Sequence, residues 1–325
     1  MTRALLRPSF GRTAHTVCSQ PPRDTADATV HEDHALTVDG ACLEVLDFGG
    51  RGPVLLFLPG YGNTAHIFDD LAPAFIDRYH VVALTPRGFP PSSAPESGYT
   101  IQQLATDVAV VLDSLGARTV TLAGHSIGGA VITEFGMRYR GRLSRAIYLD
   151  ASFDFATAYR RSHSPGKVLP SDTTSAPFRA WRTRYADWTQ GASIASTVDG
   201  SYWDRLDSAD VARRQMLVAP LAAEVRSHPH QPWRIRVPAL ALCAVGMYDR
   251  AFGWLTPDSA RWGAAAVYFD RGARAKVKEC NALKQNPAAA VILLDSGHYV
   301  FFDQRALVIS AMRHFLDSHL RATHR

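Results

Sequence analysis

Short runs of mostly apolar residues alternate with segments of helical periodicity along the chain, from about residue 35 onward. Each run holds four or five residues without charge, a pattern typical of a parallel strand that is buried on both faces. Alternating strands and helices predict the α/β class, with a mostly parallel sheet covered by helices on both sides. The strand-like runs are Val54–Leu58, Val81–Leu84, Val120–Ala123, Ala146–Leu149, Ala239–Leu242 and Val291–Leu294.

Local turn and capping signals support this interpretation. The dipeptide Asp39-Gly40 divides the stretch from Thr37 to Phe48 into the two strands of a hairpin. Thr100, followed three residues later by Gln103, has the form of a capping box at a helix N-terminus. Apolar residues then follow one helical face until Gly116, which suits the C′ position after a helix.

The alternation breaks between about residues 152 and 231, where no buried-strand run occurs and Arg, Ser, Asp and aromatic residues are frequent. A structureless loop of that length is unusual in a compact domain, so a helical insertion over the sheet is expected. The predicted organisation is a disordered tail (1–34), an α/β core (35–152 and 236–325) and a helical cap (153–235).

Composition and charge exclude several classes of protein. At 46% hydrophobic and 20% charged residues, the 325-residue chain is typical of a globular protein and not of a disordered one. The sequence contains no stretch of about 20 uncharged apolar residues, so no transmembrane helix is predicted. The formal net charge is +5, but Lys and Arg are scattered, which argues against nucleic acid as a partner.

The four cysteines predict neither a zinc site nor a disulfide framework, because none forms a C-x-x-C pair. Cys42 and Cys243 lie in apolar, strand-like runs, where a reduced and buried thiol is expected. The N-terminal residues lack the apolar segment of a secretory signal. A reducing, cytoplasmic location is therefore predicted.

The strand that ends at Ala123 leads directly into Gly124–Gly128, a G-x-S-x-G motif centred on Ser126 and followed by a helix-like segment. The motif alone is weak, but a strand before it and a helix after it are the context of a nucleophile elbow. Flanking glycines allow the sharp turn and the close approach of neighbouring chain. We therefore expect Ser126 to be a nucleophile.

A serine hydroxyl needs a base to accept its proton and a third group to orient that base. His298 follows the last strand-like run and precedes a C-terminal helical segment, which makes it the predicted base. Two acids follow strand-like runs that lie between Ser126 and His298 in sequence. Asp249 is the preferred orienting acid, and Asp150 is the alternative.

An acyl-transfer reaction also needs two donors aimed at the oxyanion. The backbone N–H of Ile127, directly after the predicted nucleophile, is one candidate. The second is the backbone N–H of Tyr61, in the Pro59–Asn63 loop after the first strand of the parallel sheet, where two glycines let the chain turn inward.

These motifs resemble those of the α/β-hydrolase superfamily, in its capped, esterase- or lipase-like branch with a serine nucleophile. The matching residues are Pro59-Gly60-Tyr61-Gly62, Arg87-Gly88, the elbow over Gly124–Gly129, Asp249 and Ser296-Gly297-His298. The resemblance implies an eight-stranded sheet, a triad of Ser126, Asp249 and His298, and a cap inserted after the sixth strand. The 49 residues from Asp249 to His298 are longer than usual for the family, which leaves the acid less secure.

The predicted chemistry is hydrolysis of a small to medium apolar carboxylic ester or lactone through an acyl-enzyme, with no cofactor and no metal. Aromatic side chains of the cap region supply an apolar lining. A C–C bond hydrolase or a peptidase would use the same triad, and a ligand-binding protein without turnover is a third class. The oligomeric state stays open. The predicted substrate-binding residues are His66, Phe153, Trp181, Trp188 and Tyr299.

Overall fold

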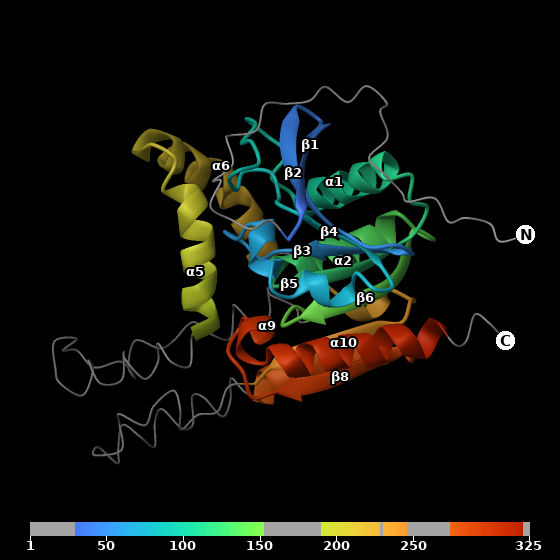
Figure 1. The fold of residues 1–325 in the computed structure, drawn as a ribbon. Helices are drawn as coiled ribbons and strands as arrows, with labels where there is room; N and C mark the ends of the chain where they lie inside the picture. The colour runs from blue at the N-terminus through green and yellow to red at the C-terminus, as the bar shows by residue number, and fades with distance from the viewer. Residues whose placement is uncertain (1–29, 153–189, 228–229, 246–273, 321–325) are drawn as a thin grey trace, which may run out of the picture.

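The computed structural model describes residues 30–152, 190–227, 230–245 and 274–320 of the chain. Their centre is an eight-stranded sheet with the order β1-β2-β4-β3-β5-β6-β7-β8 (Figure 1). β2 pairs antiparallel with both β1 and β4, and the other five pairs are parallel, which confirms the predicted class of a mostly parallel sheet. The strands are β1 (Glu32–Val38), β2 (Ala41–Gly49), β3 (Val54–Leu58), β4 (His80–Leu84), β5 (Val120–His125), β6 (Leu143–Leu149), β7 (Ala239–Ala244) and β8 (Ala289–Leu294).

Burial follows the position of each strand in the sheet. Every residue of β3, β4, β5 and β7 is buried, as uninterrupted apolar runs predict for central parallel strands. β8 also reads as a continuous apolar run, but it lies at the sheet edge and pairs with β7 alone. Its side chains are therefore more exposed, with Leu293 at 44%.

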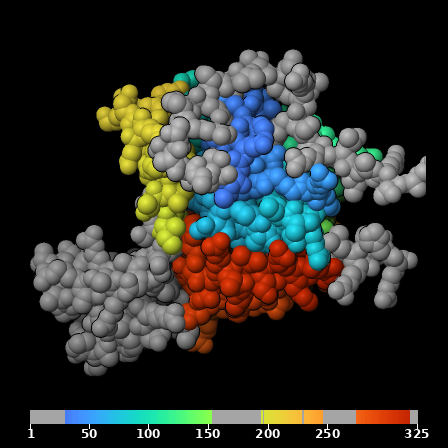
Figure 2. Space-filling view, viewed as in Figure 1, coloured from blue at the N-terminus to red at the C-terminus, as the bar shows by residue number. Residues whose placement is uncertain are grey.

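Helices cover both faces of the sheet and form two apolar clusters with it. One cluster includes residues of α1 (Ile101–Ser114), α2 (Ile127–Arg138) and α6 (Ser208–Ser227). The other includes residues of η1 (Ala65–Phe68), η2 (Ala72–Phe75), α9 (Val300–Asp303) and α10 (Arg305–Leu320). In Figure 2, the cyan segment that holds η1 and η2 separates the blue β1–β2 hairpin from the red C-terminal helix. The remaining elements are α5 (Gln190–Trp203), η4 (Pro232–Arg234) and η6 (Leu283–Gln285).

The predicted turns and caps lie where the sequence places them. Asp39 and Gly40 both have positive φ, at 44° and 73°, and join β1 to β2. The Thr100 side chain accepts a hydrogen bond from the backbone N–H of Gln103 at 3.1 Å, and Gly116 follows α1 with a φ of 64°. Only half of the capping box forms, because the Gln103 amide donates to Asp39 and Asp107.

The predicted domain boundaries are only partly visible. β1 begins at Glu32, three residues before the expected start of the core, and residues 1–29 lie outside the described part. Within the predicted cap, the described segment 190–227 is mostly helical, while 153–189 is not described. α5 contacts η1 and α9, whereas α6 contacts α1 on the other face of the sheet. A separate cap therefore stays a prediction.

The expectation of reduced cysteines is wrong. A disulfide joins Cys243 of β7 to Cys280 of the helix at 274–282, and Cys42 is disulfide-bonded as well. The pair gives no sequence signal, because the fold brings together two residues separated by 37 positions, with a Cα–Cα distance of 6.5 Å. Disulfides persist in oxidising compartments, so the cysteine argument for a cytoplasmic location fails. None of the helices in the described ranges is long and apolar enough to cross a membrane.

Candidate active site

Ser126 lies at a sharp turn between β5 and α2. Its backbone has φ 51° and ψ −119°, a conformation that a non-glycine residue rarely adopts. The Ser126 side chain does not cap α2, although serine is a common capping residue. Added Cβ atoms at Gly128 and Gly129 would lie 2.6 Å from the Leu58 carbonyl oxygen and 2.3 Å from that of Ala151. The glycines are therefore required for the close packing of the elbow.

The predicted base contacts a carboxylate. His298 Nδ1 lies 2.7 Å from Asp150 Oδ2, and Asp150 is fully buried while the His298 side chain is 42% exposed. Asp150 directly follows β6, whose last residue, Leu149, accepts a hydrogen bond from the Ser126 backbone N–H at 3.4 Å. The alternative acid of the sequence analysis thus lies beside the elbow. Asp249, the preferred one, lies outside the described residues.

The backbone and a nearby cation fix the Asp150 carboxylate. Oδ1 accepts a hydrogen bond from the Ala244 N–H at 2.9 Å, and the Asp150 N–H donates to the Leu242 carbonyl at 2.8 Å. Lys276 Nζ lies 2.9 Å from Oδ2, the same oxygen that faces His298. Burial raises the pKa of Asp150, but Lys276 and His298 outweigh it and lower the pKa to about 2. Asp150 is therefore ionised at neutral pH.

Lys276 was not singled out from the sequence. It lies in the helix at 274–282, which the Cys243–Cys280 disulfide ties to β7. No motif marks a lysine at this place, and only the packing of that helix reveals its contact with Asp150. The ring of His125, which directly precedes Ser126, packs against His298 with centroids 4.4 Å apart.

The loop with the predicted oxyanion donor lies against the elbow. A Cβ atom added to Gly60 would lie 3.2 Å from Ser126 Cβ, so this loop approaches the nucleophile closely. Gly62 has a φ of 87°, and the Gly60 carbonyl accepts a hydrogen bond from the Asn63 N–H at 3.2 Å. Tyr61, the predicted donor, lies in this turn, and its side chain is 41% exposed. Ile127, the other predicted donor, begins α2.

Helix α5 holds the same loop from outside. The buried carboxylate of Asp199 accepts hydrogen bonds from the Asn63 side chain at 2.6 Å and from the Thr64 N–H at 2.7 Å. The Asn63 amide also lies 3.2 Å from the hydroxyl of Tyr299, a predicted substrate-binding residue. The Tyr299 ring packs against His125 with centroids 4.7 Å apart. Tyr299 therefore lies between the loop and the base.

Among the other predicted substrate-binding residues, only His66 is described, and it does not contact the elbow or the base. His66 is buried, its ring nitrogens face Glu44 and Asp69, and its ring stacks on Tyr202 at 4.5 Å. Phe153, Trp181 and Trp188 lie outside the described residues.

A small cavity lies beside Ile127, one of the two predicted oxyanion donors. Its lining is almost entirely apolar and comes from the Leu58-Pro59 segment, the first turns of α1 and α2, the loop after β4, and α6. Ile127 and Pro59 both contribute to its wall, so the cavity adjoins the elbow. The lining residues are Leu58, Pro59, Leu84, Pro86, Phe89, Leu104, Asp107, Ile127, Gly128, Val131 and Leu221.

Comparison with known proteins gives a consistent result. A family model described as the alpha/beta hydrolase family matches residues 55–311. Epoxide hydrolase 3 of Mus musculus is 30% identical over 159 residues, which cover 45% of this chain and 43% of that protein. The 3-oxoadipate enol-lactonase 2 of Acinetobacter baylyi is 30% identical over 118 residues, covering 36% of this chain and 44% of that protein. These matches span less than half the length of either curated relative.

A solved structure shows the likeness over nearly the whole fold. A probable hydrolytic enzyme from Pseudomonas aeruginosa PAO1 superposes with a TM-score of 0.62 at 19% identity, covering 89% of this chain and 95% of that chain. At this identity the likeness shows the fold alone. The family match covers most of the chain, and the eight-stranded sheet agrees with it, so the protein belongs to the alpha/beta hydrolase family.

Proposed function

We propose that the protein is a serine hydrolase that cleaves a small to medium apolar carboxylic ester or lactone through an acyl-enzyme. The observation that carries the proposal is the 2.7 Å contact between His298 and the buried, ionised Asp150, next to the strained elbow at Ser126. A nucleophile, a base and an orienting acid then come from the ends of β5, β8 and β6. In this proposal Asp150 takes the role that the sequence analysis gave first to Asp249.

The reaction follows from these positions. Ser126 Oγ attacks the carbonyl carbon while its proton passes to His298 Nε2, and the backbone N–H groups of Tyr61 and Ile127 donate to the oxyanion. Collapse of the tetrahedral intermediate breaks the ester bond, and His298 returns the proton to the leaving alkoxide. Water then attacks the acyl-enzyme with His298 as base again, which releases the acid and restores Ser126. Asp150 keeps the imidazole oriented and stabilises its charged form throughout.

Two observations support an ester or lactone over an epoxide. Ser126 occupies the elbow, whereas opening an epoxide through an alkyl-enzyme ester needs a carboxylate nucleophile. One relative is named an enol-lactonase, and a lactone is an internal ester open to the same attack. The side chains next to the elbow at Leu58, Pro59 and Ile127 are apolar, which fits an apolar acyl group. The proposed partner is thus a small apolar molecule.

The test is a series of p-nitrophenyl esters, from acetate to decanoate, assayed with the wild-type protein and with Ser126→Ala. We expect nitrophenol release by the wild type and a loss of about 10⁴-fold or more in the variant. An active Ser126→Ala protein would contradict the nucleophile. Labelling of Ser126 by a fluorophosphonate without turnover of any ester would instead favour a C–C bond hydrolase or a peptidase, and absence of labelling would mean that the triad is not assembled.

A further inference from the structure

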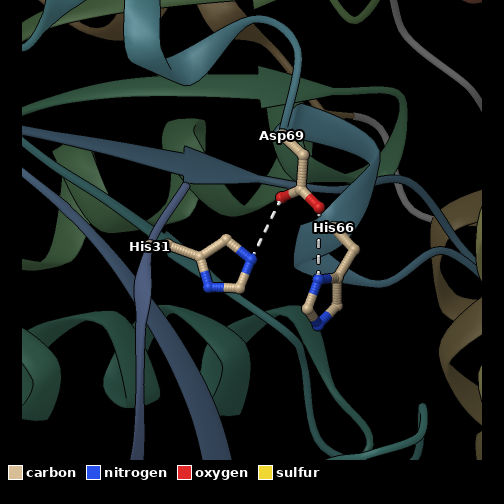
Figure 3. Close-up of side chains that lie close together, drawn as sticks. All are labelled: His31, His66 and Asp69. Carbon is tan, nitrogen blue, oxygen red and sulfur yellow. Dashed lines mark hydrogen bonds and ion pairs between the residues drawn. The ribbon is translucent and has the colours of Figure 1, made fainter. Parts of the chain in front are cut away.

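Two buried histidines face one carboxylate away from the elbow. His31 directly precedes β1, while His66 lies in η1 and Asp69 directly follows it. Figure 3 shows the imidazoles of His31 and His66 approaching the Asp69 carboxylate from two sides, each with one nitrogen turned toward it. Both histidines are more than nine-tenths buried, and one ligand atom from each of the three residues lies within 4.8 Å of the others.

Both nitrogen–oxygen separations are long for hydrogen bonds and match the spacing of ligand atoms around one ion, with Asp69 facing each histidine through a different oxygen. His31 Nε2 lies 3.5 Å from Asp69 Oδ1, and His66 Nδ1 lies 3.4 Å from Asp69 Oδ2. Optimal N–H···O bonds measure about 2.9 Å. Ligands that bind one ion at about 2.1 Å in tetrahedral geometry lie about 3.4 Å apart. Asp69 Oδ1 is buried, and no hydrogen-bond partner for it lies among the described residues.

Each histidine also has a carboxylate behind it. His31 Nδ1 lies 2.7 Å from Asp33 Oδ1, and His66 Nε2 lies 3.2 Å from Glu44 Oε1. Histidines that bind metals through one ring nitrogen usually donate the other N–H to a carboxylate or a carbonyl. The outer partners therefore leave the inner nitrogens, which face Asp69, available as ligand atoms.

Charge at the cluster favours a cation. Asp33, Asp69 and Glu44 surround two imidazoles that are neutral when they bind a metal. The three carboxylates thus favour a divalent cation between the two imidazoles.

We propose that His31, His66 and Asp69 bind one divalent transition-metal ion of the zinc class. Two imidazoles and one carboxylate are ligands that such ions prefer, and the Asp69 side chain is 29% exposed, so water can reach a fourth position. The ion joins the start of β1 to η1, which follows the Pro59–Asn63 loop. It stabilises this part of the fold and takes no part in ester hydrolysis.

Metal binding is measured directly, without an activity assay. The full-length protein is freed of metal with EDTA and titrated with ZnCl₂ by calorimetry, and its melting temperature is compared in zinc and in EDTA. We expect one Zn²⁺ per chain with a dissociation constant below 1 µM and a rise in melting temperature of about 5 °C or more. Absence of 1:1 binding in the wild type overturns the proposal.

Variants locate the ion. His66→Gln should weaken binding at least about 100-fold, and Asp33→Asn, which removes only an outer carboxylate, about 10- to 100-fold. The control is His80→Gln, since His80 is also buried and paired with a carboxylate, that of Asp47 at 2.9 Å, but lies outside the cluster. Loss of binding in the control alone, or equal binding in all variants, overturns the assignment.

A second measurement uses only the wild-type protein, so it tests the site even if the substitutions impair folding. Co²⁺ bound in the wild type by two imidazoles and a carboxylate, with four or five ligands in all, absorbs visible light strongly, whereas aqueous Co²⁺ absorbs weakly. A strong visible spectrum that saturates at one Co²⁺ per chain and is displaced by Zn²⁺ supports the site. A spectrum like that of the aqueous ion overturns it.

Discussion

His125 donates a hydrogen bond from Nε2 to the main-chain carbonyl oxygen of His298, 3.1 Å away. A carbonyl oxygen only accepts, so the proton of the imidazole must be on Nε2. Burial and the neighbouring His298 hold the pKa of His125 well below its usual value, so the ring stays neutral. His125, directly before the proposed nucleophile Ser126, thus positions the backbone of the proposed base His298.

We expect His125→Leu to lower kcat about 10- to 100-fold with little change in KM, because the carbonyl oxygen of His298 loses the hydrogen bond that the His125 side chain donates. The unpaired carbonyl should also lower the free energy of unfolding by about 1–3 kcal/mol. His125→Gln keeps a donor and should recover part of kcat. Steady-state kinetics on a p-nitrophenyl ester and denaturant unfolding measure both effects. Wild-type kcat in the leucine variant would rule out the positioning role.

The choice between the two acids is decided by a matched pair of variants. Asp150→Asn should lower kcat about 10⁴-fold, because an amide neither holds the imidazole in the required tautomer nor stabilises its charged form. Asp249→Asn should leave kcat within about threefold of the wild type if Asp150 is the orienting acid. Steady-state kinetics with circular dichroism as a folding control gives the answer. The reverse result would return the role to Asp249.

Lys276→Gln should lower stability near neutral pH and make it less dependent on pH in the acid range. A lowered pKa contributes stability that is fully present above the unfolded value, about 3.8, and is lost as the pH falls through the folded value, about 2. For the fully buried Asp150, this contribution is about 2 kcal/mol. Without Lys276 the pKa of Asp150 rises toward the unfolded value, so this contribution is smaller near neutral pH and less of it is lost as the pH falls.

Melting temperatures measured from pH 2 to pH 7 test this expectation. The melting temperature of Lys276→Gln should lie below that of the wild type at pH 7, and the difference should shrink as the pH falls from 5 toward 2. Lys278→Gln is the matched control, since Lys278 is exposed on the same helix. Curves for Lys276→Gln and the control that run parallel over the whole range would show that Lys276 has no influence on Asp150.

Local sequence patterns predict most of the fold. The apolar runs match the strands from Val54 onward, and the Asp39-Gly40 hairpin, the Thr100 cap and the Gly116 terminus are all confirmed, since each depends on neighbours in sequence. Patterns among sequence neighbours do not show which distant residues come into contact. The Cys243–Cys280 disulfide was missed for this reason.

The same distinction holds for the candidate site: local sequence patterns identify some of its residues, whereas the tertiary fold determines their contacts. Ser126 and His298 stand at strand ends that sequence can recognise, and the structure brings His298 to Asp150 across 148 positions. Two acids follow strands, and sequence alone cannot say which of them faces His298, because the answer depends on how the side chains lie in space. The contact of Lys276 with Asp150 and that of His31 with Asp69 are likewise tertiary, and no motif marks them.

Gly60→Ala should impair catalysis more than stability. The added Cβ would lie 2.7 Å from Asn63 Oδ1, 2.9 Å from His125 Nδ1 and 3.2 Å from Ser126 Cβ, so the loop must move away from the elbow. The proposed Tyr61 donor moves with it, and loss of one oxyanion donor costs about 10²- to 10³-fold in kcat.

The control is Gly200→Ala in α5, where an added Cβ meets nothing within 4 Å. It should keep wild-type kcat and gain up to about 1 kcal/mol in unfolding free energy. Equal kcat in both variants would show that the loop does not hold an oxyanion donor against Ser126.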